Sequence, residues 1–206
     1  MKKGFLCAFE GIDGSGKTTQ VKILGRRLKR LGYDFFVSKA SLGGKKQSID
    51  RFIKKFNFEK SSISTMFLFQ ALHTYQREKA QEALIENKVV LADRWNASFW
   101  VYHQELGPLK NCKDYLEVLD NIAFCGLVPD VTFLLDLPVT IAFQRRDGRG
   151  PRDTFEEETY EVFSLAKDAY LKMAEKDKSW VVIDASGSKR EVHSAICKKI
   201  RTYILK

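Results

Sequence analysis

The sequence lacks any uninterrupted apolar stretch long enough to span a membrane. Its first apolar run, residues 5–9, ends at Glu10 and is too short for the hydrophobic region of a signal peptide. None of its four cysteines has a partner at metal-ligand spacing, and we interpret them as reduced thiols. These absences argue against a transmembrane protein and a disulfide-stabilised secreted scaffold, and they predict a cytoplasmic protein.

The sequence also lacks internal repeats, linkers and low-complexity segments, so we expect one domain covering residues 1–206. Its hydrophobic content of 44% is ordinary for a globular protein with a substantial core. The formal net charge of +9 fits either a nucleic-acid partner or a site for several phosphates. Because no RNA-recognition aromatic motif or zinc pattern accompanies this charge, nucleic acid is not the partner we expect.

What the sequence does contain is a phosphate-binding pattern, G-x-x-x-x-G-K-[ST], at residues 11–18 (GIDGSGKT). An apolar run precedes it and apolar residues at helical spacing follow it, so the loop joins a strand to a helix. The glycines allow backbone N–H groups to point inward at anionic oxygens, and the helix start adds its positive end. Lys17 should reach the β- and γ-phosphates, and Thr18 should place its hydroxyl on Mg²⁺. The alternative is an ordinary glycine turn between a strand and a helix.

Apolar segments alternate with helical patterns along the whole chain. The predicted strands cover residues 5–9, 34–38, 89–92, 131–135 and 180–183. The predicted helices cover residues 17–31, 48–56, 62–87, 97–104, 112–124, 139–145, 156–176 and 191–204. Such apolar strands separated by helices indicate an α/β fold, with a five-stranded parallel sheet and helices on both faces. Ligands bind outside the carboxyl ends of such strands, so residues 11–18, 41–44 and 93–94 should share one edge with Asp136.

Several motifs in a fixed order carry a family resemblance. They are FEGIDGSGKTTQ at residues 9–20, DRW at 93–95 with Ser98 and Tyr102 following, PDVTFLLD at 129–136, an arginine-rich segment before Phe155, and IDA at 183–185. On these motifs the chain resembles the thymidylate kinase family of nucleoside monophosphate kinases over almost its full length. The resemblance implies the three-layer P-loop NTPase fold, ATP as donor, dTMP as acceptor, Mg²⁺ as cofactor, and a homodimer.

The resemblance also implies roles for charged residues near the loop. The family residue that matches Asp13 faces the acceptor nucleotide near its sugar hydroxyl and phosphate. A carboxylate in an anion-binding loop otherwise repels phosphate, which favours a specific role for Asp13 toward the sugar or toward the water of Mg²⁺. Arg94 would hold the acceptor phosphate or the moving phosphoryl group, with Asp93 beside Mg²⁺. On sequence alone, Asp93 and Arg94 are equally well explained as an ion pair at a strand end.

The segment 145–158 (RRDGRGPRDTFEEE) carries four arginines, and its glycines and proline argue against a continuous helix. In the family this segment is the lid, placed here at about residues 145–155. Mobile arginines that close over phosphates neutralise transition-state charge and exclude water. Since the phosphate loop has no arginine, Arg146, Arg149 and Arg152 are the candidates for the catalytic lid arginine. Arg145 should lie against adenine, opposite residues 185–187.

The sequence departs from the family on the acceptor side. The family often has an arginine after the second strand, but this chain has Ala40, with Lys39 as a possible substitute. In the long helix an ungapped alignment puts Leu72 at a second family arginine, whereas a shift by one residue gives an F-x-x-x-H pair of Phe69 and His73. These residues are either acceptor contacts or simply core.

The predicted site therefore has four parts. Predicted to be catalytic are Lys17, Arg94, Asp13, Arg146, Arg149 and Arg152. Assigned to ATP are Gly11, Gly14, Ser15, Gly16, Lys17, Thr18, Thr19, Arg145 and Ala185. Assigned to the acceptor are Asp13, Lys39, Phe69, His73, Arg94, Ser98 and Tyr102, and assigned to the metal are Thr18 and Asp93. The favoured hypothesis is ATP-dependent phosphorylation of dTMP. Its alternatives are a related kinase with another nucleoside monophosphate and a nucleotide-binding protein without catalysis.

Overall fold

Five short strands form the centre of the molecule, and their side chains alternate between two apolar faces of one sheet. The computed structural model describes residues 4–39, 52–53, 55–56, 58–59, 62–107, 109–110, 112–148 and 159–204. The strands are β1 (Phe5–Glu10), β2 (Phe35–Lys39), β3 (Val89–Asp93), β4 (Val131–Asp136) and β5 (Trp180–Asp184). They are all parallel, in the order β2-β3-β1-β4-β5. The predicted five-stranded parallel sheet is confirmed.

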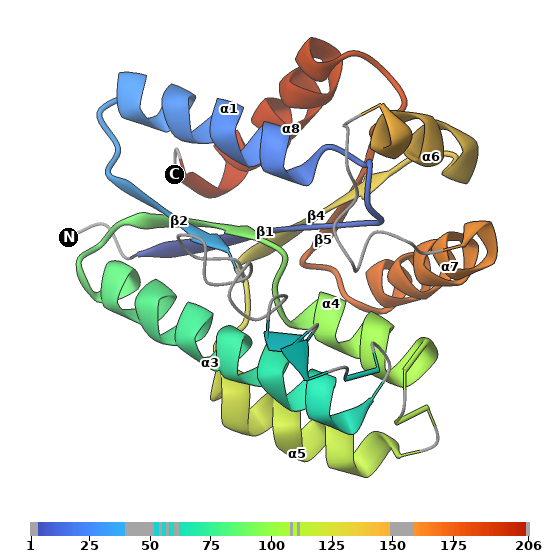
Figure 1. The fold of residues 1–206 in the computed structure, drawn as a ribbon. Coiled ribbons are helices and arrows are strands. Elements are labelled where there is room, and N and C mark those ends of the chain that lie inside the picture. The colour runs from blue at the N-terminus through green and yellow to red at the C-terminus, as the bar shows by residue number, and fades with distance from the viewer. Residues whose placement is uncertain are drawn as a thin grey trace.

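Helices cover both faces of this sheet (Figure 1). Helices α1 (Lys17–Arg30) and α8 (Lys189–Ile204) pack together on one face. On the other face lie α3 (Ile63–Ile85), α5 (Lys113–Phe124) and α7 (Tyr160–Lys176). Within the described residues, no helix is both long enough and apolar enough to cross a membrane.

The core has one layer on each side of the sheet. Cys7 and Phe9 of β1 point into the cluster that contains Leu24 of α1, whereas Leu6 and Ala8 point into the cluster beneath α3. This period of two is the pattern of a strand that is buried on both faces. The same parallel register brings the ends of β1, β3 and β2 together, since Phe9 pairs with Asp93 and Asp93 with Lys39.

Two predicted helices differ from the observed ones. The predicted helix 97–104 is α4 (Asn96–Trp100), which continues as a π-helix, η2 (Val101–Glu105). The predicted helix 139–145 is α6 (Val139–Asp147), so Arg146 is helical and does not begin a loop as we expected. Gly148 is the C-cap, and residues 149–158 lie outside the described residues, as does most of the predicted helix 48–56.

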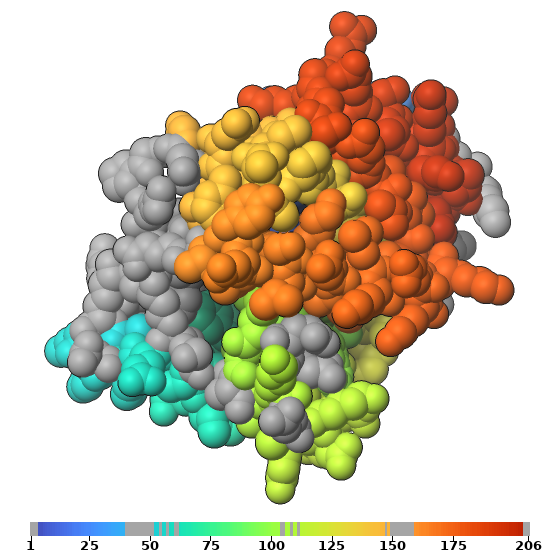
Figure 2. All heavy atoms as spheres, turned by 90° about the vertical axis from the view of Figure 1, so that its right-hand side faces the viewer, coloured from blue at the N-terminus to red at the C-terminus, as the bar shows by residue number. Residues whose placement is uncertain are grey.

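Helix α7 lies near the carboxyl ends of the strands and contacts the elements that follow both β3 and β4. It packs against α6 on one side and against η2 on the other, and Figure 2 shows it between these elements. Its N-terminus is capped by Thr159, whose hydroxyl accepts a hydrogen bond from the N–H of Val162 at 3.3 Å. The side chains on the inner face of α7 can therefore reach residues that follow β3 and β4.

Candidate active site

The loop between β1 and α1 has the conformation that its glycines predict. Gly14 has a φ of 84°, and a Cβ atom there would lie 2.3 Å from the carbonyl oxygen of Ala142 on α6. Gly11 has a φ of 132°, and a Cβ atom would lie 2.7 Å from the carbonyl oxygen of Leu135. Any side chain at either position would collide with backbone, so both must be glycine for the loop to pack on β4 and α6.

Lys17 is folded back over this loop. Its Nζ atom donates hydrogen bonds of 2.9 Å to the carbonyl oxygens of Gly11 and Ile12, and lies 3.6 Å from Oδ1 of Asp13. Burial, followed by the positive charge of Arg94, lowers the pKa of the Lys17 ammonium to about 8, although nearby carboxylates oppose the shift. A phosphate that entered the loop would offer Lys17 a stronger partner than the two carbonyls.

Thr18, Asp93 and Lys39 meet where α1 begins and β2 and β3 end. The hydroxyl of Thr18 donates to Oδ2 of Asp93 at 2.6 Å, and Nζ of Lys39 lies 3.2 Å from the same oxygen. Burial alone would raise the pKa of the Asp93 carboxyl, but Lys39, Lys17 and the hydrogen bond from Thr18 together lower it. Asp93 is therefore an ionised carboxylate beside the phosphate loop.

Arg94 is the most highly connected side chain of the site. It has a φ of 72°, which is uncommon for a residue with a side chain and costs about 1 kcal/mol or more. Its Nη2 atom donates to Oδ1 of Asp13 at 2.5 Å, and its Nη1 atom donates to the carbonyl oxygen of Gly11 at 3.1 Å. Nη1 also lies 3.0 Å from both the Ser98 and the Tyr170 hydroxyls. These contacts hold the guanidinium against the phosphate loop.

Near Arg94 lies the buried carboxylate of Glu10, which was not among the predicted site residues. Glu10 is fully buried, and its Oε1 atom accepts hydrogen bonds from the N–H groups of Trp95 at 2.7 Å and Ser98 at 3.3 Å. Its Oε2 atom accepts from the Ser98 hydroxyl at 2.7 Å. Burial raises the pKa of the Glu10 carboxyl, and Arg94 and the hydrogen bonds from Ser98 and Trp95 oppose this. Glu10 thus ties the end of β1 to the first turn of α4.

Two further residues were missed, and both come from α7. The Tyr170 hydroxyl lies 2.8 Å from the Ser98 hydroxyl in addition to its contact with Arg94, and Lys167 forms a 2.5 Å ion pair with Asp136 at the end of β4. Glu10 is the last residue of an otherwise apolar strand, and this place in the sequence does not reveal that it is buried or which groups it contacts. Nothing in the sequence near Tyr170 marks it, because its partners come from distant segments.

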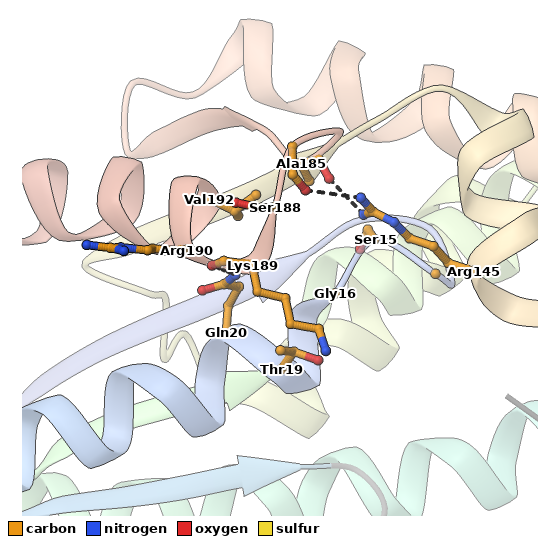
Figure 3. A pocket seen from close by; sticks show the side chains of 12 residues that line it. Ser15, Gly16, Thr19, Gln20, Arg145, Ala185, Ser188, Lys189, Arg190 and Val192 are labelled. Carbon is orange, nitrogen blue, oxygen red and sulfur yellow. Dashed lines mark hydrogen bonds between the residues drawn. The ribbon is translucent and has the colours of Figure 1, made fainter. Parts of the chain in front are cut away.

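A pocket of about 750 Å³ opens beside the loop, between α1, α6 and the start of α8. Its lining includes Ser15, Gly16, Thr19 and Arg145 (Figure 3). Arg145 donates from Nη1 to the carbonyl oxygen of Ala185 at 2.8 Å, and from Nη2 to the carbonyl oxygens of Ser186 at 2.9 Å and Gly187 at 3.1 Å. The structure therefore brings together the two segments expected to enclose the base of ATP.

Two of the four lid arginines, Arg145 and Arg146, belong to the described residues. Arg146 is only 4% exposed, and its guanidinium carbon lies 3.9 Å from the ring centroid of Phe143 and 5.0 Å from that of Phe163. This position between two aromatic rings is typical of a cation that stabilises packing between α6 and α7. Arg149 and Arg152 lie outside the described residues, and a catalytic role for Arg146, Arg149 or Arg152 stays a prediction.

Of the residues expected on the acceptor side, Tyr102 lies beside Arg94, whereas Ser98 and His73 are buried. The Tyr102 ring centroid lies 5.5 Å from the guanidinium carbon of Arg94, whereas Ser98 is buried under it. His73 lies between the rings of Phe99 and Phe124, with centroid distances of 6.2 and 5.8 Å. Phe69 is half-buried, Leu72 is buried, and Ala40 is outside the described residues. Contacts of Phe69, His73 and Ser98 with an acceptor stay predictions.

A parallel sheet of this strand order, whose first strand leads through a glycine-rich loop into a helix, defines a P-loop nucleotide-binding protein. Arg94 contacts Asp13 of that loop, and an arginine held beside the phosphate loop is a feature of phosphoryl-transfer sites. Comparison with known proteins identifies the family. The family model described as thymidylate kinase matches residues 9–196.

Individual relatives agree with this match. The thymidylate kinase of Thermoanaerobacter sp. (strain X514) is 33% identical over 206 residues, which is 98% of this chain and 100% of that protein. That of Halothermothrix orenii is 32% identical, over 99% of this chain and 100% of that protein. That of Fervidobacterium nodosum is 30% identical, over 96% and 98%. The chain belongs to the thymidylate kinase family.

Proposed function

We propose that the protein transfers the γ-phosphoryl group of ATP to dTMP, giving ADP and dTDP. The observation that carries this proposal is the convergence of Lys17, Asp13 and Arg94 on the phosphate loop, in a chain of the thymidylate kinase family. The donor would enter the pocket beside Arg145, with its phosphates in the loop and its base near Ala185. The acceptor would approach from the side of Arg94 and Lys39.

The chain's own residues supply positioning and charge. Lys17 exchanges its two carbonyl partners for donor phosphate oxygens, and the loop N–H groups hold the remaining charge. Arg94 stabilises the negative charge on the phosphoryl group as it moves, because its planar fork can hold two oxygens at once. Asp13 orients the acceptor sugar. No covalent intermediate with the protein is required, since in-line transfer depends on alignment and electrostatics.

Mg²⁺ fits the residues at the start of α1. The Thr18 hydroxyl and the ionised Asp93 carboxylate lie 2.6 Å apart, and oxygen donors of this kind are those that Mg²⁺ prefers. In the described part of the chain no group of three or more His, Cys, Asp or Glu side chains forms a protein-only metal site, which fits an ion that also binds substrate phosphates. When bound, the ion neutralises charge on the phosphates.

The proposal is tested by measuring ADP release with ATP, Mg²⁺ and each common nucleoside monophosphate in turn. We expect dTMP to give the highest kcat/KM and Lys17→Ala to lower it at least a thousandfold. Lys22→Ala, which removes an exposed lysine from the same helix, is the matched control and should retain activity. Turnover of another monophosphate without turnover of dTMP would replace the acceptor, and no turnover with any acceptor would overturn the proposal.

We also propose a homodimer, in line with the family. Tyr115, Val118 and Ile122 follow each other at helical spacing on α5 and are 69%, 56% and 64% exposed. An exposed apolar stripe of this kind is typical of a protein interface. Light scattering of the purified protein should give twice the chain mass, and Val118→Asp should give the monomer.

A further inference from the structure

The positive charge of the protein is concentrated on two helices. Helices α1 and α8 together contain eleven lysines and arginines but only one acidic residue, Glu191, which gives them a net charge of +10. The whole chain has a formal net charge of +9, so the rest of the chain is close to neutral. The two helices pack side by side on the same face of the sheet (Figure 1). Because basic and acidic residues nearly balance in the rest of the chain, the net positive charge of the molecule lies on this face.

The charge is densest at the C-terminal ends of the two helices. Residues 26–30 (RRLKR) and 198–201 (KKIR) contain seven basic side chains, which we call the α1–α8 basic face. Leu28 and Ile200, the apolar residues of these segments, are both buried in the same core cluster. The packing of these two residues fixes the segments on the sheet and leaves Arg26, Lys29, Arg30 and the three basic residues of 198–201 exposed.

The two segments are close, because α1 packs on α8 with Leu28 and Ile200 in one core cluster, and their charges act on the same neighbouring residues. Burial, followed by the charges of Arg27 and Arg30, lowers the pKa of His193 on α8. Burial raises the pKa of Cys197, and the charges of Arg27 and Arg201 oppose that shift. Arginines from both helices thus act on the same seam between them, although the segments are far apart in the sequence.

Among the described residues, the basic side chains of the face are not ion-paired. In the part of the chain that the structure describes, no carboxylate forms an ion pair with any of its seven basic side chains. A helix C-terminus favours an individual cation by about 0.3–1 kcal/mol, but cations crowded together repel one another. A ligand with closely spaced negative charges would relieve this repulsion.

We propose that the α1–α8 basic face binds the phosphate backbone of double-stranded nucleic acid. A duplex presents phosphates in two rows along its surface, and two adjacent basic helices can contact several of them without reading bases. A single strand would require several exposed aromatic rings for stacking, whereas Tyr203 on α8 is 37% exposed and already packs its ring on Phe5, with centroids 6.0 Å apart. Leu31 is the large exposed apolar residue nearest to the face along α1, which is too little apolar surface for insertion into a membrane.

The face is separate from the substrate site. The phosphate loop lies at the N-terminus of α1, whereas residues 26–30 form its last turn, about 15 Å further along the helix at 1.5 Å per residue. Lys189 and Arg190, the basic residues at the start of α8, line the nucleotide pocket and do not belong to the face. The net charge of the sequence is compatible with a nucleic-acid partner but does not locate the surface, because the two basic segments become one surface only in the fold.

The test is fluorescence anisotropy of a labelled twenty-base-pair DNA duplex of mixed sequence at low salt. The test variant is Lys29→Gln/Lys198→Gln/Lys199→Gln, and the control is Lys172→Gln/Lys176→Gln/Lys178→Gln on and after α7, where three exposed lysines are removed from another face. Both variants lose the same net charge. We expect duplex affinity in the micromolar range, a loss of at least tenfold in the test variant, and a loss of less than twofold in the control.

Three further readouts complete the experiment. The slope of log affinity against log salt should decrease in magnitude by about 2–3 in the test variant, since each lost phosphate contact removes about 0.9. Saturating ATP at constant ionic strength should leave duplex binding unchanged, and both variants should keep kinase activity. An equal loss in both variants, displacement of the duplex by ATP, no duplex binding at low salt, or binding to anionic vesicles in place of the duplex would each overturn the proposal.

Discussion

The hydroxyl of Thr18 donates a hydrogen bond of 2.6 Å to the Oδ2 atom of Asp93, which joins the first turn of α1 to the last residue of β3. The parallel register of β1 and β3 brings about this contact, because it sets the end of β3 beside the phosphate loop. The same carboxylate oxygen also carries the ion pair with Lys39 at the end of β2. One carboxylate therefore connects the donor loop with the strand that leads to the acceptor side.

Asp93→Asn should change the requirement for Mg²⁺. The amide keeps the shape of the side chain but loses the negative charge that accepts the Thr18 hydrogen bond and pairs with Lys39. We expect the Mg²⁺ concentration at half-maximal activity to rise about tenfold or more. The free energy of unfolding without metal should change little. Activity measured over a Mg²⁺ titration checks this, and an unchanged titration midpoint would argue against a role for Asp93 at the ion.

Tyr170→Phe should weaken catalysis without weakening donor binding. The hydroxyl contacts Arg94 and Ser98 but lies on α7, away from the nucleotide pocket, so Tyr170 is a positioning residue. We expect kcat to fall about tenfold, KM for ATP to stay within twofold, and stability to fall by about 1 kcal/mol. Tyr160→Phe, at an exposed position of the same helix, is the matched control and should behave as wild type.

The Tyr170 prediction fails if KM for ATP rises as much as kcat falls, because that would place the tyrosine in donor binding. It also fails if Tyr160→Phe and Tyr170→Phe lose the same activity. Burial raises the pKa of the Tyr170 hydroxyl, so the group stays protonated and the activity ratio of the two variants should not change up to pH 9.

ATP binding should take up protons near pH 8. The pKa of Lys17 in the ligand-free protein is lowered to about 8, so at that pH about half of the Lys17 side chains are in the neutral amine form. Donor phosphates favour the charged form, and binding should therefore take up about half a proton at pH 8 and almost none at pH 6.5. Calorimetry in two buffers of different ionisation enthalpy measures the uptake, and Lys17→Met should abolish it. The same uptake in wild type and Lys17→Met would contradict the assignment.

The free energy of unfolding should fall as the pH falls, because His73 is buried in its neutral form. Burial, followed by the charges of His103 and Arg94, lowers the pKa of His73 to about 3. Between its unfolded value near 6.5 and about 3, only the unfolded state binds the proton, so stability is lost as the pH falls through this window. At pH 5 the loss is about 2 kcal/mol for this residue. Urea unfolding at pH 7.5 and 5 should show that much less pH dependence in His73→Leu, and an equal loss in both proteins would contradict it.

The sheet and the donor side were predictable because they follow from local patterns. Apolar runs of strand length and the glycine pattern gave the five strands and the loop, and the expected proximity of Arg145 to Ala185 matches the observed hydrogen bond. In the observed sheet β3 lies beside β1, so residues 93–94 lie beside the loop. This agrees with the rule that ligands bind at the carboxyl ends of parallel strands.

The network around Arg94 was not predictable, because it depends on contacts between distant segments. Glu10 reads in the sequence as the end of a strand, and Tyr170 as one aromatic residue of an amphipathic helix. The helical start of the lid was missed for a similar reason, since Arg146 is held between Phe143 and Phe163 and the second ring comes from another helix. The shift that paired Phe69 with His73 kept a helical turn between them but could not show that His73 packs against Phe99 and Phe124.

The most direct test of the account follows the γ-phosphate itself. Incubation of the protein with [γ-³²P]ATP, Mg²⁺ and dTMP, followed by nucleotide chromatography, should show the label moving into dTDP. Arg94→Gln should lower the rate at least a hundredfold, because the charge that stabilises the moving group is lost, while ATP binding is retained. Label that appears in inorganic phosphate but not in dTDP would contradict the assignment of this chain as a kinase of dTMP.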